Sequence, residues 1–294
     1  MNQKFVYLFM VLSAVLMWSF SFPLIKIALE NGVPPITLAT LRSLVFIPIL
    51  IFLFIKHGKN SIPSSKKDWI GLLAIGIFTI ILPNIFQNIG MTYTTASASS
   101  IIQTSGPIFT IILAVLFLGE LLNLKKITGA IVALIGILLI IISNNGAFTL
   151  KGLTVYGNVL ILLSSFSYAI SSIITKRELR RIYPLQMLGF STLIGFVGLI
   201  IISIVEEPQH VIINISINTW LVIFLLALFP SFIAILLWYE VMVHEEISRL
   251  IIFIYLMPVF AVIVSYILLG EIISLQTTIF ATLVIGGVAL AQKK

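Results

Sequence analysis

Long apolar runs without charged side chains dominate this chain. A bilayer core about 30 Å thick is crossed by about 20 apolar residues in an α-helix, so each run can form a transmembrane helix. Ten such runs occur, near 5–29, 36–55, 69–92, 96–119, 124–142, 156–175, 184–205, 219–241, 248–270 and 275–291. The sequence therefore predicts an all-α integral membrane protein with ten transmembrane helices.

The composition excludes a soluble protein. Only 9% of the 294 residues are Asp, Glu, Lys or Arg, whereas a soluble domain is about 25% charged. The longest gaps between spans are 56–68, 143–155 and 206–218, which cannot hold a nucleotide-binding domain. An ATP-driven pump is therefore excluded as well.

Basic residues gather on one side of the predicted membrane. With the N-terminus in the cytoplasm, all but three of the 17 Lys and Arg residues fall on the cytoplasmic side, the exceptions being Lys26, Arg42 and Lys151. Cytoplasmic loops carry such an excess. We therefore expect a multi-pass protein of the cytoplasmic membrane with both termini in the cytoplasm, and no nucleic-acid partner despite the net charge of +7.

Sparse residue types recur at a fixed separation of 151 positions. Pro107 is matched by Pro258, and Gly119-Glu120 is matched by Gly270-Glu271. These matches predict two homologous halves, 1–145 and 146–294. Since each half has an odd number of spans, the halves should be inverted repeats, an arrangement found in many secondary transporters.

The repeated Gly-Glu pair also has a local interpretation. Gly ends one helix, because a positive φ costs it little. Glu, followed by Asn123 or Ser274, then begins the next helix, where a carboxylate is favourable. This tight helical hairpin is preferred over direct handling of substrate or protons by Glu120 or Glu271.

Two five-span repeats, each with a Pro followed thirteen residues later by Gly-Glu, resemble the EamA family of the drug/metabolite transporter superfamily. The segment Trp18-Ser19-Phe20-Ser21-Phe22 with Lys26 also resembles that family's first helix, although Tyr168 stands at the second-repeat position of Trp18. The resemblance implies a monomeric secondary transporter of small metabolites, often an amino-acid exporter, that works by rocking the two halves. It further implies a central cavity lined by the first, third, fourth, sixth, eighth and ninth spans.

Polar side chains inside spans are candidates for the substrate site, because they are costly in lipid unless they face a cavity or a partner. Asn84, Gln87 and Asn88 share one stripe of the third span. They could form a hydrogen-bonding wall, or they could hold helices together.

Two prolines should bend their helices. Pro107 frees the carbonyl of Gln103, and Pro258 frees that of Ile254. Each carbonyl could contact a ligand or could be covered by Ser or Thr neighbours, and we expect both kinked spans to move.

Three charged residues have open roles. Glu240 could carry a coupling proton or bind a substrate ammonium, or it could pair with Arg249 or lie among headgroups. Lys26 could be an outer-gate ligand or an interfacial anchor. Arg42 could bind a carboxylate, but the second span is peripheral in the resembled family, so snorkelling or a structural ion pair is preferred.

Aromatic side chains could line a largely apolar cavity and stack on the substrate. The candidates are Trp18, Phe22, Tyr93, Tyr168, Trp238, Tyr239 and Tyr255.

Catalytic signatures are missing from the sequence. There is no cysteine, the single aspartate Asp68 lies in a loop, and His57, His210 and His244 lie in loops or at span ends. We therefore expect no enzyme activity, no cofactor and no metal. The expected function is export of amino acids or related metabolites by alternating access, with a small-molecule substrate, the lipid bilayer and a coupling proton as partners. The alternatives are a transporter of cationic drugs or of sugar- or nucleotide-type compounds, a non-transporting receptor or assembly protein, and a membrane-embedded enzyme.

Overall fold

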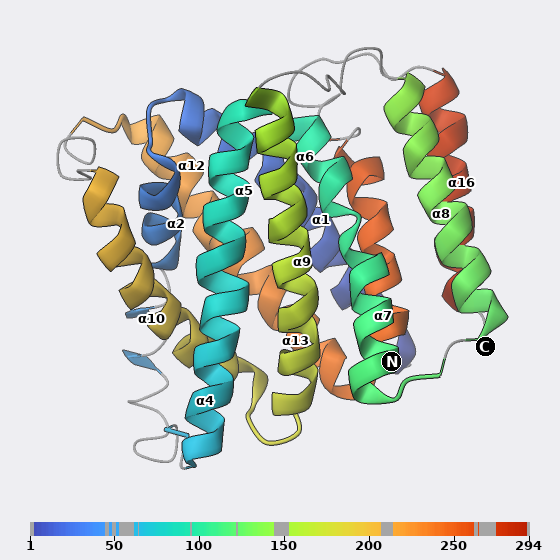
Figure 1. The fold of residues 1–294 in the computed structure, drawn as a ribbon, viewed down its shortest axis with the longest axis horizontal. Coiled ribbons are helices and arrows are strands. Elements are labelled where there is room, and N and C mark those ends of the chain that lie inside the picture. The colour runs from blue at the N-terminus through green and yellow to red at the C-terminus, as the bar shows by residue number, and fades with distance from the viewer. Residues whose placement is uncertain are drawn as a thin grey trace.

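The computed structural model describes residues 3–44, 47–48, 51–52, 62–63, 65–94, 96–121, 123–143, 153–206, 214–261, 264 and 275–292. Within these ranges the chain forms helices and short turns, without a strand, and the helices pack side by side as one bundle (Figure 1). The prediction of an all-α membrane protein is confirmed. Gly270-Glu271 and Ser274 of the predicted repeat lie outside the described residues.

Helical segments occupy all ten predicted spans. In chain order they are α1 (Gln3–Glu30), α2 (Pro35–Ser43), α4 (Lys66–Ile75), η2 (Gly76–Ile81), α5 (Leu82–Tyr93), α6 (Ala96–Gln103), α7 (Gly106–Leu118), α8 (Leu124–Ser143), α9 (Leu153–Glu178), α10 (Pro184–Ser203), η3 (Ile204–Glu206), α12 (Ile217–Leu226), η4 (Ala227–Ile233), α13 (Ala234–His244), α14 (Ile247–Leu250), η5 (Ile251–Leu256) and α16 (Leu275–Gln292).

Local sequence signals explain where several helices begin and end. Proline, which is tolerated in the first turn of a helix, opens both α2 and α10. Ser65 and Asp68 form a reciprocal capping box at the start of α4. Gly119 follows α7 with a φ of +67°, so the prediction that it ends this helix is confirmed.

In the described part of the chain, each half shows one π-helical turn, and the two turns lie at matching places. These turns are η2 and η4, and Gly76 and Ala227, their first residues, are 151 positions apart. The wider turn moves side chains out of the regular α-helical register. Such turns are frequent at functional sites.

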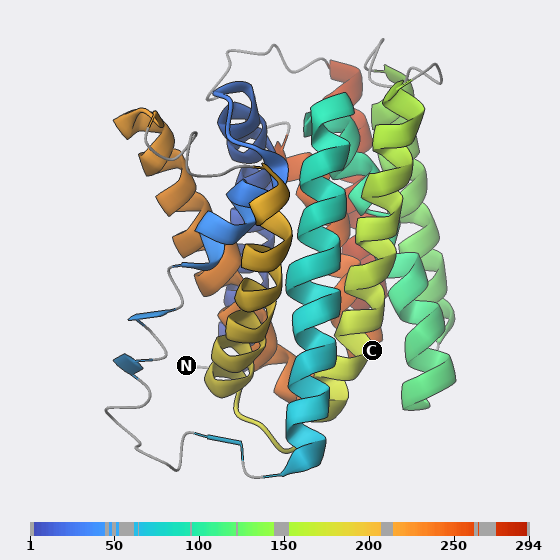
Figure 2. The ribbon, with the colours of Figure 1, turned by 60° about the vertical axis from the view of Figure 1, so that its left-hand side comes forward.

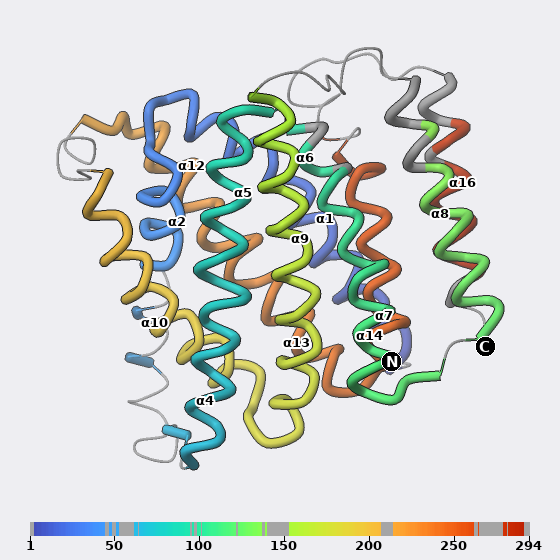
Figure 3. The backbone as a smooth tube through the Cα atoms, viewed as in Figure 1, coloured from blue at the N-terminus to red at the C-terminus, as the bar shows by residue number. Residues whose placement is uncertain are grey.

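The chain runs up and down the bundle, so that both ends of the chain lie toward the same end of it, the lower one in Figure 1. We call this the termini end. Corresponding segments of the two halves, such as α5 and α13, run in opposite directions (Figure 3).

The outer surface carries many large apolar side chains, and polar side chains are buried inside beside the apolar core. Phe9 and Leu116 are about two-thirds exposed on the outer surface, while Ser19, Ser164 and Ser165 are fully buried inside. Lipid can cover the apolar exterior, and the interior polar groups find partners or face a cavity.

Helices α5 and α9 come together with their backbones in close approach (Figure 2). A Cβ atom on Gly90 would lie 2.8 Å from the carbonyl oxygen of Gly157, and one on Gly157 would lie 2.7 Å from that of Gly90. Only glycine allows this approach, which joins the two sequence halves. Small residues serve the same purpose in other membrane helix pairs.

Candidate functional site

A cavity of about 170 Å³ lies between the two halves. Its wall is formed by α1, α2, η2, α5, α6 and α7 from the first half and by α9, α10, η4, α13 and η5 from the second. The six spans implied by the resemblance all contribute. The second and seventh spans, α2 and α10, contribute too.

Most of the predicted site residues lie in this wall, although their role in substrate binding stays a prediction. Those in the wall are Trp18, Phe22, Asn84, Gln87, Gln103, Pro107, Tyr168, Trp238 and Tyr239. Those that do not line it are Lys26, Asn88, Tyr93, Glu240, Tyr255 and Pro258.

The residues outside the wall have other surroundings. Asn88 is fully buried and its Nδ2 donates to the carbonyl oxygen of Pro35 on α2, at 2.9 Å. Tyr93 is 39% exposed and packs edge-on against Tyr156. Tyr255 is fully buried in the apolar core. Asn88 therefore supports helix packing, which was one of its two predicted roles.

Trp18 connects the halves across the cavity. Its indole Nε1 donates to the carbonyl oxygen of Pro230 in η4, at 3.0 Å, and its ring lies 5.1 Å from that of Trp238. The pair of indoles supplies a large apolar surface for a bound solute.

In the matching turn, η2, polar groups are hydrogen-bonded to neighbouring side chains. Nδ2 of Asn84 donates to the carbonyl oxygen of Ile80, at 2.8 Å, and the hydroxyls of Thr79 and Ser171 are hydrogen-bonded to each other. Asn84 thus lines the cavity while stabilising its own helix. Asn84 and Asn88 both donate to backbone carbonyls, whereas no such bond from Gln87 is seen among the described residues. Gln87 lines the cavity.

Arg42 lies in the wall, so its expected peripheral placement was wrong. It is only 9% exposed, and its Nε and Nη2 both donate to the hydroxyl oxygen of Ser231 in η4, at 3.2 and 2.9 Å. Its Nη1 has no hydrogen-bond partner within the described part of the chain. Ser231 in η4 thus lies beside α2, and no sequence pattern indicated this contact.

Further polar atoms of the wall lack protein partners. Within the described ranges, Oε1 of Gln103 and the hydroxyls of Thr110 and Thr192 are buried without a hydrogen bond. Buried polar atoms are normally paired, and those that are not need an explanation such as a ligand or water. A solute in the cavity could supply the missing partners.

The carbonyls opposite the two prolines are already bonded. Ser165 on α9 donates its hydroxyl to the carbonyl oxygen of Gln103, at 3.0 Å. The carbonyl of Ile254 was predicted to be free, but it accepts a hydrogen bond from the backbone N–H of Met257. The alternative of a bend stabilised by a serine neighbour holds for Pro107.

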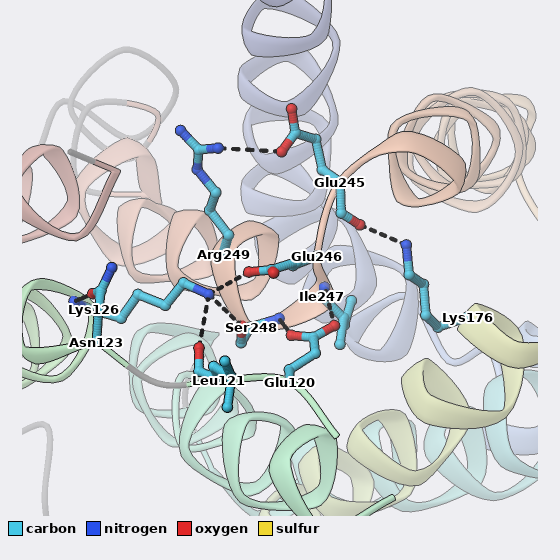
Figure 4. Close-up of polar contacts among 10 residues, drawn as sticks. All are labelled: Glu120, Leu121, Asn123, Lys126, Lys176, Glu245, Glu246, Ile247, Ser248 and Arg249. Carbon is cyan, nitrogen blue, oxygen red and sulfur yellow. Dashed lines mark hydrogen bonds and ion pairs between the residues drawn. The ribbon is translucent and has the colours of Figure 1, made fainter. Parts of the chain in front are cut away.

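A polar network closes the termini end between the halves (Figure 4). Both carboxylate oxygens of Glu120 accept from the backbone N–H groups of Ile247 and Ser248, each at 2.9 Å. Lys126 contacts Glu246 and the hydroxyl of Ser248. The carboxylate was predicted to favour a helix N-terminus, but it caps α14 in the other half rather than the adjacent α8. Helix α8 begins at Asn123, whose Oδ1 accepts from the N–H of Lys126, as predicted.

Two lysines at matched positions donate hydrogen bonds to the C-terminal end of another helix in their own half. The ammonium of Lys26 donates to the carbonyls of Met91 and Thr94 at the end of α5, at 3.0 and 3.2 Å. Lys176, 150 positions later, donates to the last carbonyls of α13. A cation at a helix C-terminus is favourable.

Glu240 lies on α13, half-buried and outside the cavity wall. Arg249, one of its predicted partners, pairs with Glu245, with Nη1 and Oε2 3.3 Å apart. The cavity wall therefore contains Arg42 as its charged residue, together with hydroxyl, amide and aromatic groups. Groups of these kinds are able to bind a small solute. Among the described residues, no cluster of His, Cys, Asp or Glu could hold a metal ion.

Comparisons with known proteins agree with this architecture. The profile of the EamA-like transporter family matches residues 5–142 and again residues 155–292. An "Uncharacterized transporter" of Archaeoglobus fulgidus is 27% identical, over 95% of this chain and 96% of that protein. A Salmonella typhimurium protein named "Probable amino-acid metabolite efflux pump" is 27% identical over 95% of this chain and 92% of its own length. One solved crystal structure has the same fold, with a TM-score of 0.77 at 19% identity, covering 96% of this chain and 95% of that one.

Proposed function

Because the chain belongs to the EamA-like transporter family, we propose that it is a secondary transporter that exports amino acids or related small metabolites across the cytoplasmic membrane. The relative named as an amino-acid metabolite efflux pump supports this choice of substrate. Alternating access by rocking of the two halves is the proposed mechanism.

The main structural support for this proposal is the cavity. It lies between the halves, combines aromatic faces with unpaired polar atoms, and is lined by both π-helical turns. Binding sites for small molecules have this character, an apolar wall with a few polar groups. In secondary transporters the site lies between repeats, where movement of one repeat against the other exposes it to alternate sides.

Residues 1–145 and 146–294 are proposed to be inverted repeats. The opposite directions of their corresponding helices, the matched π-helical turns and the matched lysine ties support this. An odd number of spans in each half also places both termini on one side, which the distribution of Lys and Arg favours as the cytoplasm.

Protons are the proposed coupling ion, with Glu240 as their carrier. Replacing Glu240 by Gln should abolish flux driven by a pH gradient while sparing exchange of labelled for unlabelled substrate. Unchanged driven flux would remove Glu240 from this role. The opening movement is proposed to involve the helices at Pro107 and Pro258 and the hydrogen bonds of Lys26 to the end of α5. The protein is proposed to act as a monomer.

Counterflow in proteoliposomes tests the transport function. Purified protein is reconstituted with each of a panel of unlabelled amino acids, nucleosides, sugars and organic cations inside, and uptake of the same labelled compound is followed. Transient accumulation that depends on the internal compound is expected for at least one amino acid. If no compound in the panel shows it, a receptor, an assembly protein or an enzyme becomes the better explanation.

A further inference from the structure

We infer that Arg42 binds a carboxylate of the transported molecule, so that the substrates are small organic carboxylates rather than organic cations. This inference rests on the proposed transport function and specifies its substrate class.

The first observation is an uncompensated buried charge. Arg42 is buried, with only 9% of its surface exposed, and it forms no ion pair with any described acidic residue. Buried charges in proteins are normally paired, because transfer from water is costly otherwise. Among the residues that the structure describes, the wall of the cavity contains no Asp or Glu that could supply a counter-charge. An anion entering the cavity would supply it.

The second observation concerns the donors of the guanidinium. A guanidinium has five N–H donors in a planar fork that matches the two oxygens of a carboxylate. In Arg42 two of its nitrogens share one neutral acceptor, the hydroxyl of Ser231, and Nη1 has no partner among the described residues. The Ser231 hydroxyl in turn donates to the carbonyl of Leu226, at 2.9 Å. Ser231 therefore orients the guanidinium but leaves most of its donor capacity unused.

The rest of the wall suits the remainder of such a molecule. The indoles of Trp18 and Trp238 offer an apolar surface, and Oε1 of Gln103 is an unpaired acceptor for an amino or hydroxyl group. The cavity of about 170 Å³ is comparable with an engineered cavity of about 150 Å³ that binds benzene. A compact carboxylate with an apolar body fits this description.

Two matched sets of compounds test the substrate class. The first is L-leucine with 3-methylbutylamine, which lacks the carboxylate, and 4-methylpentanoate, which lacks the amino group. The second is L-phenylalanine with phenethylamine and 3-phenylpropionate. Each is tested as an unlabelled competitor of the solute that gave the strongest counterflow. Carboxylates should compete at least about tenfold better than the matched amines, as expected for one bidentate ionic contact. Equal or better competition by the amines would overturn the inference and leave transport intact.

Variants separate substrate binding from a structural role. Arg42→Gln should raise the KM for counterflow at least about tenfold, and Arg42→Lys, which keeps the charge but not the fork, should recover part of the loss. Ser231→Ala removes the hydroxyl that orients the guanidinium and leaves the charge, so it should raise KM less than Arg42→Gln does. If Arg42→Gln still prefers carboxylates over the matched amines to the same extent as the unchanged protein, Arg42 only links α2 to η4 and the inference is wrong. Should Arg42→Gln fail to fold, an unchanged KM for Arg42→Lys, together with equal competition by amines, would also overturn it.

Discussion

Removing the carboxylate of Glu120 should open the termini end of the bundle. This side chain caps α14 of the opposite half through two hydrogen bonds of 2.9 Å each. Hydrogen bonds to a charged group contribute about 1.5–3 kcal/mol each, and the partial exposure of Glu120 reduces this value. We therefore expect Glu120→Ala to shift the balance between the closed and open arrangements by about 1–3 kcal/mol, or about 5–150-fold.

A single introduced cysteine can measure this shift, since the natural chain has none. Thr175 lines the cavity, is 1% exposed and lies in the last turn of α9. That end of α9 faces the termini end of the bundle (Figure 1), so Thr175→Cys reports on access from there. Its labelling by N-ethylmaleimide in membranes should be faster in the Glu120→Ala background. Thr128→Ala, which removes an exposed hydroxyl of α8 outside this network, is the control and should have no effect. If both backgrounds label at the same rate, the cap does not hold this end closed.

Three further changes have distinct expected results. Gly287→Ala should destabilise the protein by about 1–3 kcal/mol, because its Cβ would lie 2.7 Å from a carbonyl oxygen of α8, whereas Gly286→Ala has open space and should be neutral or stabilising; equal unfolding midpoints in detergent would contradict this. Trp18→Phe should keep an aromatic ring beside Trp238 but lose the bond to Pro230 and part of the packing of the indole, lowering stability by at least about 0.5–1.5 kcal/mol in the same assay; an unchanged midpoint would argue against that bond. Lys26→Met should expose the last carbonyls of α5 and speed hydrogen exchange there, while unchanged exchange would show that the tie is not needed.

The spans could be predicted because lipid imposes a rule that needs no knowledge of tertiary contacts. An apolar run of sufficient length must be helical, since its backbone groups have no other partner in the membrane. The end of α7 at Gly119 was predictable for a similar reason, because only the local conformation matters there. In contrast, the π-helical turns η2 and η4 have no sequence signature comparable with that of Gly119.

The partners of polar side chains could not be predicted from spacing alone. Asn84 and Asn88 share one helical stripe, yet Asn84 bonds within its own helix and Asn88 bonds to α2. Glu120 caps a helix, as its chemistry requires, but in the other half of the chain. Arg42 lies in the cavity wall, where it is hydrogen-bonded to Ser231 of η4. Each outcome depends on which helices become neighbours, and spacing within one helix carries no information about that.

The contact between Gly90 and Gly157 has a consequence for how this chain can be divided. The two residues belong to different halves, and nothing larger than a hydrogen atom fits between their backbones. Neither half could therefore complete its packing if synthesised alone, because the helix face around its glycine and its share of the cavity would face lipid. A protein made from one such half would have to assemble with a second copy inserted in the opposite orientation.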